Sequence, residues 1–140
     1  MKLQLQHLAP YLPYGLKMKH YENNRIGTLQ GVSTNTLGQP YSLCVNTNWY
    51  NPFVYKPILR PLSDLTKEIE VNGEKFVPIE RFYEFIDNVD FLDQMLEDIN
   101  SNNSIANWQY DVVNKLLEWH FDVFGLIEQK IAIDINTLEL

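Results

Sequence analysis

The stretch with the clearest potential for chemistry is Glu118-Trp119-His120-Phe121-Asp122, which places a histidine between two carboxylates. At about 100° per residue on a helix, His120 lies about 160° from Glu118 and about 200° from Asp122. Neither carboxylate can therefore share a metal ion with it locally. The imidazole instead projects into an apolar stripe. The sequence favours a core histidine that hydrogen-bonds to backbone, and the alternative is a general base in a cleft between a helix and a sheet.

A second candidate is the aromatic run from Trp49 to Lys56, in which Trp49, Tyr50, Tyr55 and Lys56 are the candidate binding residues. Aromatic side chains interleaved with lysine and arginine can stack the bases of single-stranded nucleic acid on a small barrel. The other interpretation of the same residues is a core or a hairpin tip packed on helices.

The nucleic-acid hypothesis makes a demand on the fold. It requires that the basic side chains of the first half gather on one surface; these are Lys17, Lys19, Arg25, Lys56 and Arg60.

A third candidate is the acidic side of an amphipathic helix expected over residues 80–99. Its proposed contact residues for a protein partner are Asp87, Asp90, Phe91, Asp93 and Met95. Phe91 and Met95 project on the acidic side if the helix is continuous, and an apolar spot among charges is common at interfaces. The alternative is an ordinary solvated helix face. A break at Asp87-Asn88 into two shorter helices also remains open.

The motifs that carry nucleotide, phosphate or zinc chemistry are absent from the chain. It has no Gly-x-Gly-x-x-Gly, no phosphate loop and no His-Glu-x-x-His, and no Gly-x-Ser-x-Gly elbow. Cys44 is the single cysteine and is expected to be a buried, inert thiol in the middle of a strand. We therefore expect no metal and no cofactor, and the sequence leans away from an enzyme.

Charge divides the chain. Residues 1–60 carry six basic side chains and one acid, which gives +5, whereas residues 61–140 carry five basic and seventeen acidic side chains, which gives −12; together these make the net charge of −7. The excess of acid argues against non-specific binding to nucleic acid, because phosphate neutralisation needs clustered Lys and Arg. Mutual neutralisation of the two halves by packing is the simpler interpretation.

Length and composition predict one soluble, cytoplasmic domain over residues 1–140. A chain of 140 residues has the usual size of a single domain, and 45% apolar residues with 21% charged residues are ordinary for a globular protein. No apolar run approaches the roughly 20 residues that a membrane span needs. The start of the chain lacks the pattern of a signal peptide.

The sequence pattern predicts that the elements positioning these residues form an α+β fold. Four short strands are expected at Leu16–Lys19, Thr28–Val32, Tyr41–Val45 and Val54–Leu59, forming a small antiparallel meander or open barrel, with Pro57 confining the fourth to an edge or a strand end. The part over residues 1–60 is thus β-rich and basic.

The acidic part over residues 61–140 is expected to be mainly helical. Asn72-Gly73 predicts a type I′ hairpin. Amphipathic helices are expected over residues 80–99 and 108–129, followed by a terminal strand in which Ile131, Ile133 and Ile135 alternate with other residues.

Three parts of the chain carry a resemblance; they are His7–Leu16, then Lys56–Leu65 followed by Asn72–Ile79, and then Leu117–Ile127 followed by Ala132–Leu138. Together they resemble a family of small proteins carried by phages, prophages and other mobile elements of Bacteroidetes. That family brings no assigned activity, so it supplies no functional residue. What the resemblance implies is an accessory protein made in a bacterial host cell.

The sequence therefore predicts a non-enzymatic accessory protein that binds a macromolecular partner, in the first place another protein. The alternative is a nucleic-acid-binding module that uses the basic, β-rich half. A third possibility is a small enzyme with a cleft at His120.

Overall fold

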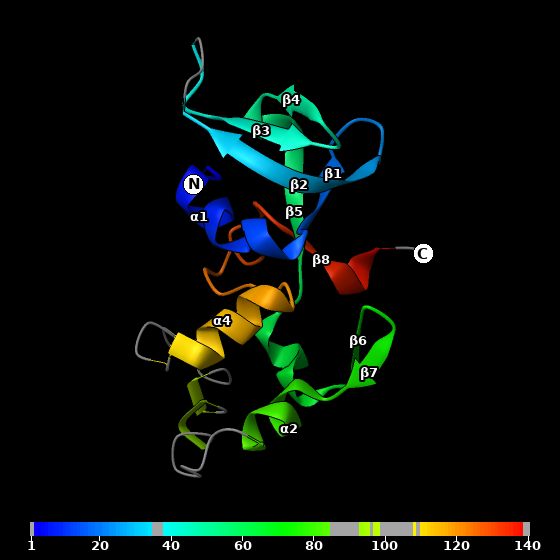
Figure 1. The fold of residues 1–140 in the computed structure, drawn as a ribbon, viewed down its shortest axis with the longest axis vertical. Coiled ribbons are helices and arrows are strands. Elements are labelled where there is room, and N and C mark those ends of the chain that lie inside the picture. The colour runs from blue at the N-terminus through cyan, green and yellow to red at the C-terminus, as the bar shows by residue number, and fades with distance from the viewer. Residues whose placement is uncertain are drawn as a thin grey trace.

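A computed structural model describes residues 2–34, 38–84, 93–95, 97–98, 108 and 110–138. Its centre is a six-stranded sheet in the order β4-β3-β2-β1-β5-β8 (Figure 1). The strands are β1 (Lys17–His20), β2 (Ile26–Ser33), β3 (Ser42–Val45), β4 (Asn48–Tyr50), β5 (Tyr55–Leu59) and β8 (Ile133–Asp134). Neighbours are antiparallel except β5 and β8, which are parallel. With the helices described below, this confirms the predicted α+β class. Strands β1 to β4 form an antiparallel meander, but β5, the fourth predicted strand, pairs with β1 and does not continue it.

The sheet curls around β2. The first residues of β2 pair with β1, and the rest pair with β3 across a bulge between Leu29 and Gly31. A bulge places an extra residue in one strand and increases its twist. The inserted residue is Gln30, whose side-chain Oε1 accepts a hydrogen bond from the backbone N–H of Thr47 at 2.7 Å. That contact ties β2 to the turn between β3 and β4.

Strand β4 was not predicted, because its turn lacks the usual signal. The turn residues Asn46 and Thr47 have φ values of 50° and 72°, as a type I′ hairpin requires, but no glycine is present. The expectation that Pro57 confines its strand to an edge was wrong for β5 as a whole, which lies between β1 and β8. Pro57 itself is paired on one side only, opposite Met18 of β1, because β8 pairs with β5 only from Ile58 onward.

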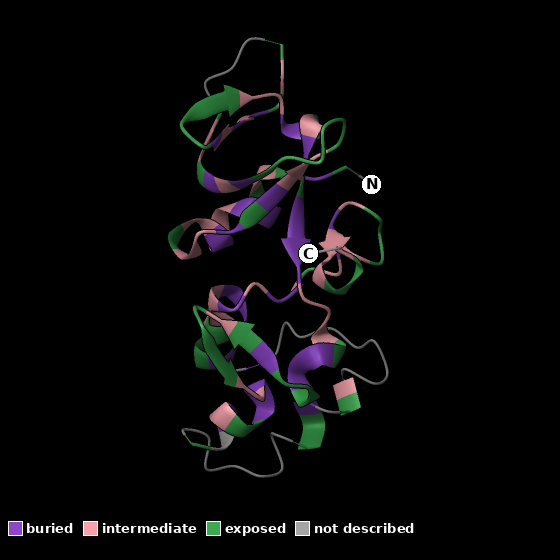
Figure 2. Ribbon diagram, turned by 90° about the vertical axis from the view of Figure 1, so that its right-hand side faces the viewer, coloured by how far each residue is buried: buried purple, intermediate pink, exposed green. Residues whose placement is uncertain are grey.

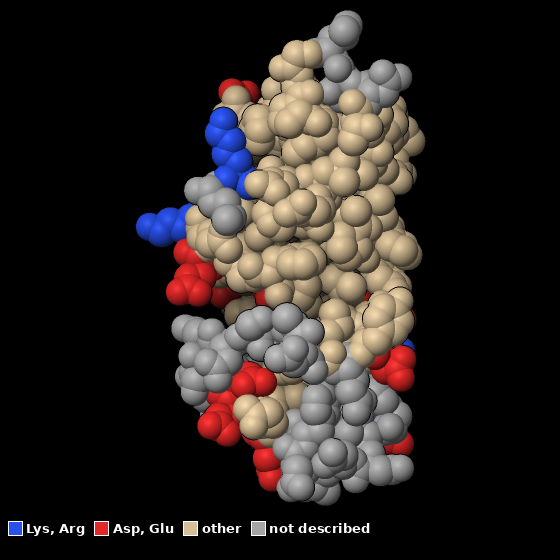
Figure 3. All heavy atoms as spheres, turned by 90° about the vertical axis from the view of Figure 1, so that its left-hand side faces the viewer, with Lys and Arg blue, Asp and Glu red and all other residues tan. Residues whose placement is uncertain are grey.

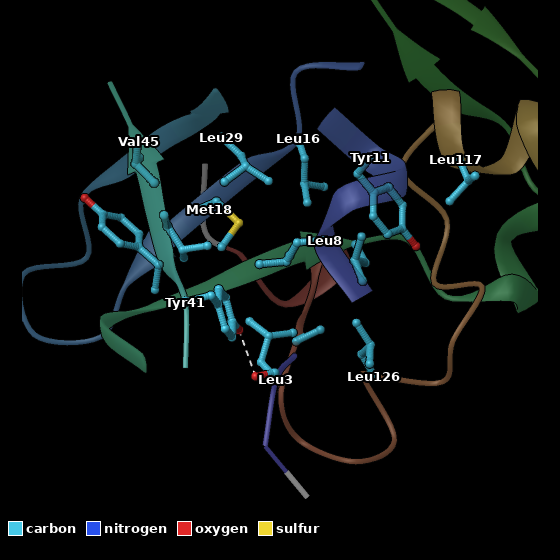
Figure 4. Close-up of a cluster of buried hydrophobic side chains, with 14 residues drawn as sticks. Leu3, Leu8, Tyr11, Leu16, Met18, Leu29, Tyr41, Val45, Leu117 and Leu126 are labelled. Carbon is cyan, nitrogen blue, oxygen red and sulfur yellow. Dashed lines mark hydrogen bonds between the residues drawn. The ribbon is translucent and has the colours of Figure 1, made fainter. Parts of the chain in front are cut away.

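The inner face of the sheet packs against the N-terminal segment, formed by α1 (Leu5–Leu8) and the 3-10 helix η1 (Ala9–Tyr14). Leu8, Tyr11 and Leu16 are completely buried there against side chains of β1, β2 and β3 (Figure 4). Tyr41 donates a hydrogen bond to the carbonyl oxygen of Leu3 at 2.8 Å. This first core holds the sheet and the N-terminus together.

A second core lies below the first, in the acidic part of the chain (Figures 1 and 2). Its elements are the 3-10 helix η3 (Leu62–Thr66), the hairpin of β6 (Ile69–Val71) and β7 (Glu74–Phe76), α2 (Pro78–Tyr83) and α4 (Tyr110–Glu118). The predicted hairpin is confirmed, since Asn72 and Gly73 have φ values of 52° and 83°. It leans on the core through Ile69, which is buried.

Helix α4 connects the two cores. Leu117 is buried in the first core, whereas Leu116 is buried in the second. Behind the helix, Arg60 and Phe121 form an isolated parallel bridge. Among the described residues, no helix is long and apolar enough to cross a membrane.

The helix expected over residues 80–99, for which a break into two was left open, is not continuous, because it is already interrupted at Glu84. Helix α2 begins at Pro78, a residue favoured in the first turn, and ends at Tyr83, with Glu84 in a turn. Helical residues recur at 93–95 and 97–98. The predicted break at Asp87-Asn88 lies outside the described residues.

The prediction of a helix over residues 108–129 was wrong in its second half. Helix α4 ends at Glu118 because His120 is left-handed, with a φ of 62°. The N–H of His120 bonds the carbonyl of Leu117, and the N–H of Phe121 bonds that of Leu116. This is the Schellman pattern of helix termination, which usually uses glycine, so a histidine there concealed the end of the helix. The terminal strand is confirmed, but β8 has two residues.

Candidate binding surface

His120 is held in a structural role by the end of α4. Its ring Nε2 lies 2.7 Å from the carbonyl oxygen of Tyr14, and because a carbonyl only accepts, Nε2 carries the proton and donates it. Burial lowers the pKa of His120, and the nearby Arg60 and Lys17 lower it further, whereas the bond to Tyr14 acts in the opposite direction. The neutral ring therefore ties the helix end to η1. The predicted hydrogen bond to backbone is confirmed, whereas the predicted core position is not, because His120 is only partly buried.

A cavity of about 450 Å³ lies beside this contact, between η1 and α4. Its lining consists of Tyr14, Asp111, Asn114, Lys115 and Glu118. Lys115 and Glu118 form an ion pair at 2.8 Å across the helix surface. His120 is not part of the lining, so this cavity does not supply the cleft that an enzyme centred on His120 would need.

Asp122, which the sequence analysis considered only as a carboxylate near His120, is buried. Its oxygens accept the N–H groups of Leu126 and Ile127, both at 2.8 Å. Burial raises the pKa of Asp122, and these backbone donors offset part of that rise. The carboxylate organises the loop after α4, and the signal that identifies it is Gly125, whose φ of 72° marks a turn.

His7 lies close to the same loop. Its ring contacts Phe124 at 5.7 Å between centroids, and its Nδ1 accepts the backbone N–H of Gln4 at 3.0 Å. Burial lowers the pKa of His7, and the charge of Asp122 partly opposes this. Across the described part of the chain, no group of three or more His, Cys, Asp or Glu side chains is arranged to hold a metal ion.

Only two of the five residues predicted to contact a protein partner, Asp93 and Met95, belong to the described part of the chain, and the prediction that Met95 is exposed was wrong. Met95 is completely buried in the second core, because the helix that would expose it is not continuous. Asp93 is exposed. Asp87, Asp90 and Phe91 lie outside the described residues. On the face drawn in Figure 3, acidic side chains gather mainly over the lower part of the molecule.

The aromatic run divides between the two faces of the sheet. Tyr55 is buried in the first core, and Tyr50 packs edge-on against it at 5.1 Å, so these two were wrongly counted as binding residues. Trp49 is 57% exposed on the outer face, and Lys56 is exposed there as well. The alternation of side chains along β4 and β5 causes this separation.

The pairing of strands brings lysines of the first half together on the outer face. Lys19 of β1 lies directly opposite Lys56 of β5, and Lys17 is two residues along β1 on the same face. Inward-facing Met18 and Leu16, which flank Lys17, are completely buried, which fixes this orientation. We call Lys17, Lys19 and Lys56 the lysine row. Sequence reasoning named all three but could not show that they are neighbours.

The two arginines of the first half do not belong to the lysine row. Arg60 turns inward, where its guanidinium donates to the carbonyl oxygens of Trp119 and Glu70 at 3.1 and 2.9 Å. Arg25 lies near Tyr55, whose pKa its charge lowers against the stronger effect of burial. Of the five basic side chains that the nucleic-acid hypothesis requires on one surface, three therefore lie together.

Cys44 is half-buried on the outer face and not fully buried as predicted. It is the Cα partner of Trp49 across β3 and β4, and its Sγ lies 3.8 Å from Oε1 of Gln30. Its place in the middle of a strand is confirmed.

Comparison with known proteins adds nothing to this geometry, because no protein-family model, no curated protein and no solved structure matches the chain.

Proposed function

We propose that the protein is a non-enzymatic binding module and that the outer face of its sheet takes nucleic acid. The observation that carries this proposal is the lysine row. Lys19 and Lys56 face each other across neighbouring strands, and none of the three lysines forms an ion pair within the described residues. Like charges directly opposite one another destabilise a sheet. An anionic ligand relieves that repulsion, and a chain of phosphates matches a row of positive charges.

The acidity of the whole chain does not oppose this, since most of the acidic side chains belong to the second half of the sequence. Only one acid, Glu22, occurs in residues 1–60, and the other seventeen belong to residues 61–140. Positive charges dispersed along the sequence therefore become concentrated on β1 and β5. Three lysine–phosphate contacts predict a slope of about −2 to −3 for log affinity against log salt concentration.

The test measures binding of a dye-labelled oligonucleotide of mixed sequence by fluorescence anisotropy at low salt. Lys19→Glu is expected to weaken binding about tenfold or more, because it removes one contact and introduces repulsion of phosphate. Lys75→Glu changes charge equally on the exposed strand β7 and is expected to leave binding nearly unchanged.

The same variant also tests the physical argument. Lys19→Glu replaces a like-charge pair by an opposite-charge pair with Lys56, which is worth roughly 0.2–1 kcal/mol of added stability. We therefore expect Lys19→Glu to fold at least as stably as the original chain while binding nucleic acid less well. Equal binding by the original chain and by Lys19→Glu would refute the proposal.

A protein partner on the acidic part is the second proposed function. It is favoured by Tyr110, which is 75% exposed and lies next to Asp111 at the start of α4. Exposed Asp93 belongs to the same part of the chain. Affinity purification of the tagged protein from bacterial cells at low and at high salt tests it: a stoichiometric protein lost at high salt supports this surface. An accessory role encoded by a mobile element is the setting we propose for either function.

A further inference from the structure

Trp49 differs from the other two tryptophans in its exposure. It is 57% exposed, whereas Trp108 and Trp119 are each 7% exposed and belong to the second core. A large aromatic side chain left in water on a sheet gains little from packing and is available to a ligand.

The indole of Trp49 lies over a glycine of the next strand but one. A Cβ atom built on Gly31 would stand 3.7 Å from Cη2 of Trp49, so the ring rests close to the backbone of β2 at the bulge. Cys44 separates the two residues on β3, as the partner of both. The rim of the indole at Cη2 thus lies against the sheet.

We infer that the ligand of this face is single-stranded nucleic acid, with an unpaired base stacked on Trp49 and the phosphates of neighbouring nucleotides on the lysine row. This inference rests on the proposed function, and it adds the substrate class. Bases within a duplex are already stacked on each other and cannot lie on a side chain, whereas every unpaired base offers a π face. A row of lysines alone does not distinguish single-stranded from duplex nucleic acid, whereas an exposed Trp49 favours the single strand.

The spacing of the strands sets the length of the ligand. Trp49 on β4 is separated by three strand spacings from Lys17 and Lys19 on β1, and by four from Lys56 on β5. At about 4.8 Å per spacing, Lys17 and Lys19 lie roughly 14 Å from Trp49 along the sheet. The polar surface between them includes Thr28, whose Oγ1 accepts a hydrogen bond from Lys17 Nζ at 2.7 Å. A stacked strand advances about 3.4 Å per nucleotide, so about four nucleotides reach from Trp49 to Lys17 and Lys19.

The first experiment compares a single-stranded oligonucleotide of about eight nucleotides with a hairpin duplex of the same composition, for the full chain and for Trp49→Ala. We expect the single strand to bind more tightly than the duplex. Loss of the indole is expected to weaken single-strand binding by about 5- to 150-fold, which corresponds to about 1–3 kcal/mol, without changing duplex binding. Trp49→Phe keeps a ring and should restore most of the affinity. Tyr110→Ala, which removes an exposed aromatic side chain from α4, is the matched control.

Two reporters already present in the chain measure occupancy of the site directly. Because Trp108 and Trp119 are buried, the emission that acrylamide quenches comes from Trp49, and stacking of a base should reduce both the emission and its quenching. Cys44 is the single cysteine of the chain and the strand partner of Trp49, so a bound strand should slow its alkylation by iodoacetamide. Polyphosphate, an anion without bases, should bind the lysine row without quenching Trp49.

The outcomes separate the two proposals. Lysine-dependent binding in which the duplex equals the single strand, and in which Trp49→Ala has no effect, overturns this inference and leaves the proposed function intact. Absence of nucleic-acid binding at low salt, with Trp49 emission and Cys44 alkylation unchanged, overturns both. If Trp49→Ala does not fold, Trp49→Phe and the alkylation of Cys44 decide between these results.

Discussion

Replacing Tyr11 by phenylalanine tests how η1 is joined to the segment that follows α4. The phenol of Tyr11 is completely buried and donates a hydrogen bond of 2.6 Å to the carbonyl oxygen of Phe121, which is 110 residues away in the sequence. It also accepts the N–H of Val123 at 3.4 Å. Burial raises the pKa of Tyr11, so the hydroxyl stays protonated and remains a donor.

The cost of Tyr11→Phe follows from what each partner retains. The carbonyl of Phe121 still accepts the N–H of Val123 at 3.0 Å, so it is not left without a donor. A typical buried hydrogen bond contributes about 0.5–1.5 kcal/mol, and an orphaned polar group costs about 1–3 kcal/mol. With the acceptor half satisfied, we expect a loss of about 1–2 kcal/mol. The ring itself is kept, including its edge-on contact with Phe124.

Urea unfolding followed by circular dichroism measures this difference between the original chain and the variant. Tyr110→Phe is the control, since its ring is 75% exposed and its hydroxyl can bond water in both states. We expect the control to change the free energy of unfolding by less than about 0.5 kcal/mol. A Tyr11→Phe variant as stable as the control would show that the bond to Phe121 does not hold the two segments together.

Three further changes test other parts of the fold. Gly27→Ala should destabilise the protein by about 1–3 kcal/mol, because a Cβ there would lie 2.5 Å from a side-chain carbon of Val45 in β3. Gly31→Ala is the control, since a Cβ there meets only an ordinary contact at 3.7 Å. The urea midpoint of unfolding should therefore be lower for Gly27→Ala than for Gly31→Ala. Phe82→Ala should cost about 3–5 kcal/mol, since the ring is completely buried in the second core, and calorimetry that finds an unchanged melting temperature would contradict its placement. Stability should fall as the pH is lowered below about 6.5, the ordinary pKa of histidine. Burial lowers the pKa of His120 and His7 in the folded state, so the unfolded chain binds more protons below that pH. The loss of stability is complete once the pH is below the folded pKa values of both histidines. His120→Asn, which tolerates the left-handed backbone, should make that decline shallower in a urea series from pH 5 to pH 8.

Local patterns predicted much of the sheet because alternation and turn residues act over a few positions. The alternation around Met18 and the Asn72-Gly73 turn both led to elements that the structure contains. The same local reasoning missed β4, whose Asn46-Thr47 turn is held by a hydrogen bond that the N–H of Thr47 donates to the side chain of Gln30, 17 residues earlier in the chain.

The helices were predicted less well because their ends are set by distant partners. An apolar period continues past Glu118, but the chain leaves the helix at His120, where the imidazole finds the carbonyl of Tyr14 and Phe121 pairs with Arg60. For the same reason Met95 was assigned to a surface, although it lies in the second core. The helical spacing of apolar residues predicts which of them share a face only as far as the helix continues.

For the candidate surface, the sequence by itself determined the residue types: a basic first half, an aromatic run from Trp49, and a single cysteine. Only the tertiary structure decided which of them meet. The antiparallel pairing of β1 with β5 sets Lys19 opposite Lys56, although 37 residues separate them, and strand alternation turns Tyr55 into the core while it leaves Trp49 in water. Strand register is fixed by burial of the inner face as a whole, and no local stretch of sequence contains that information.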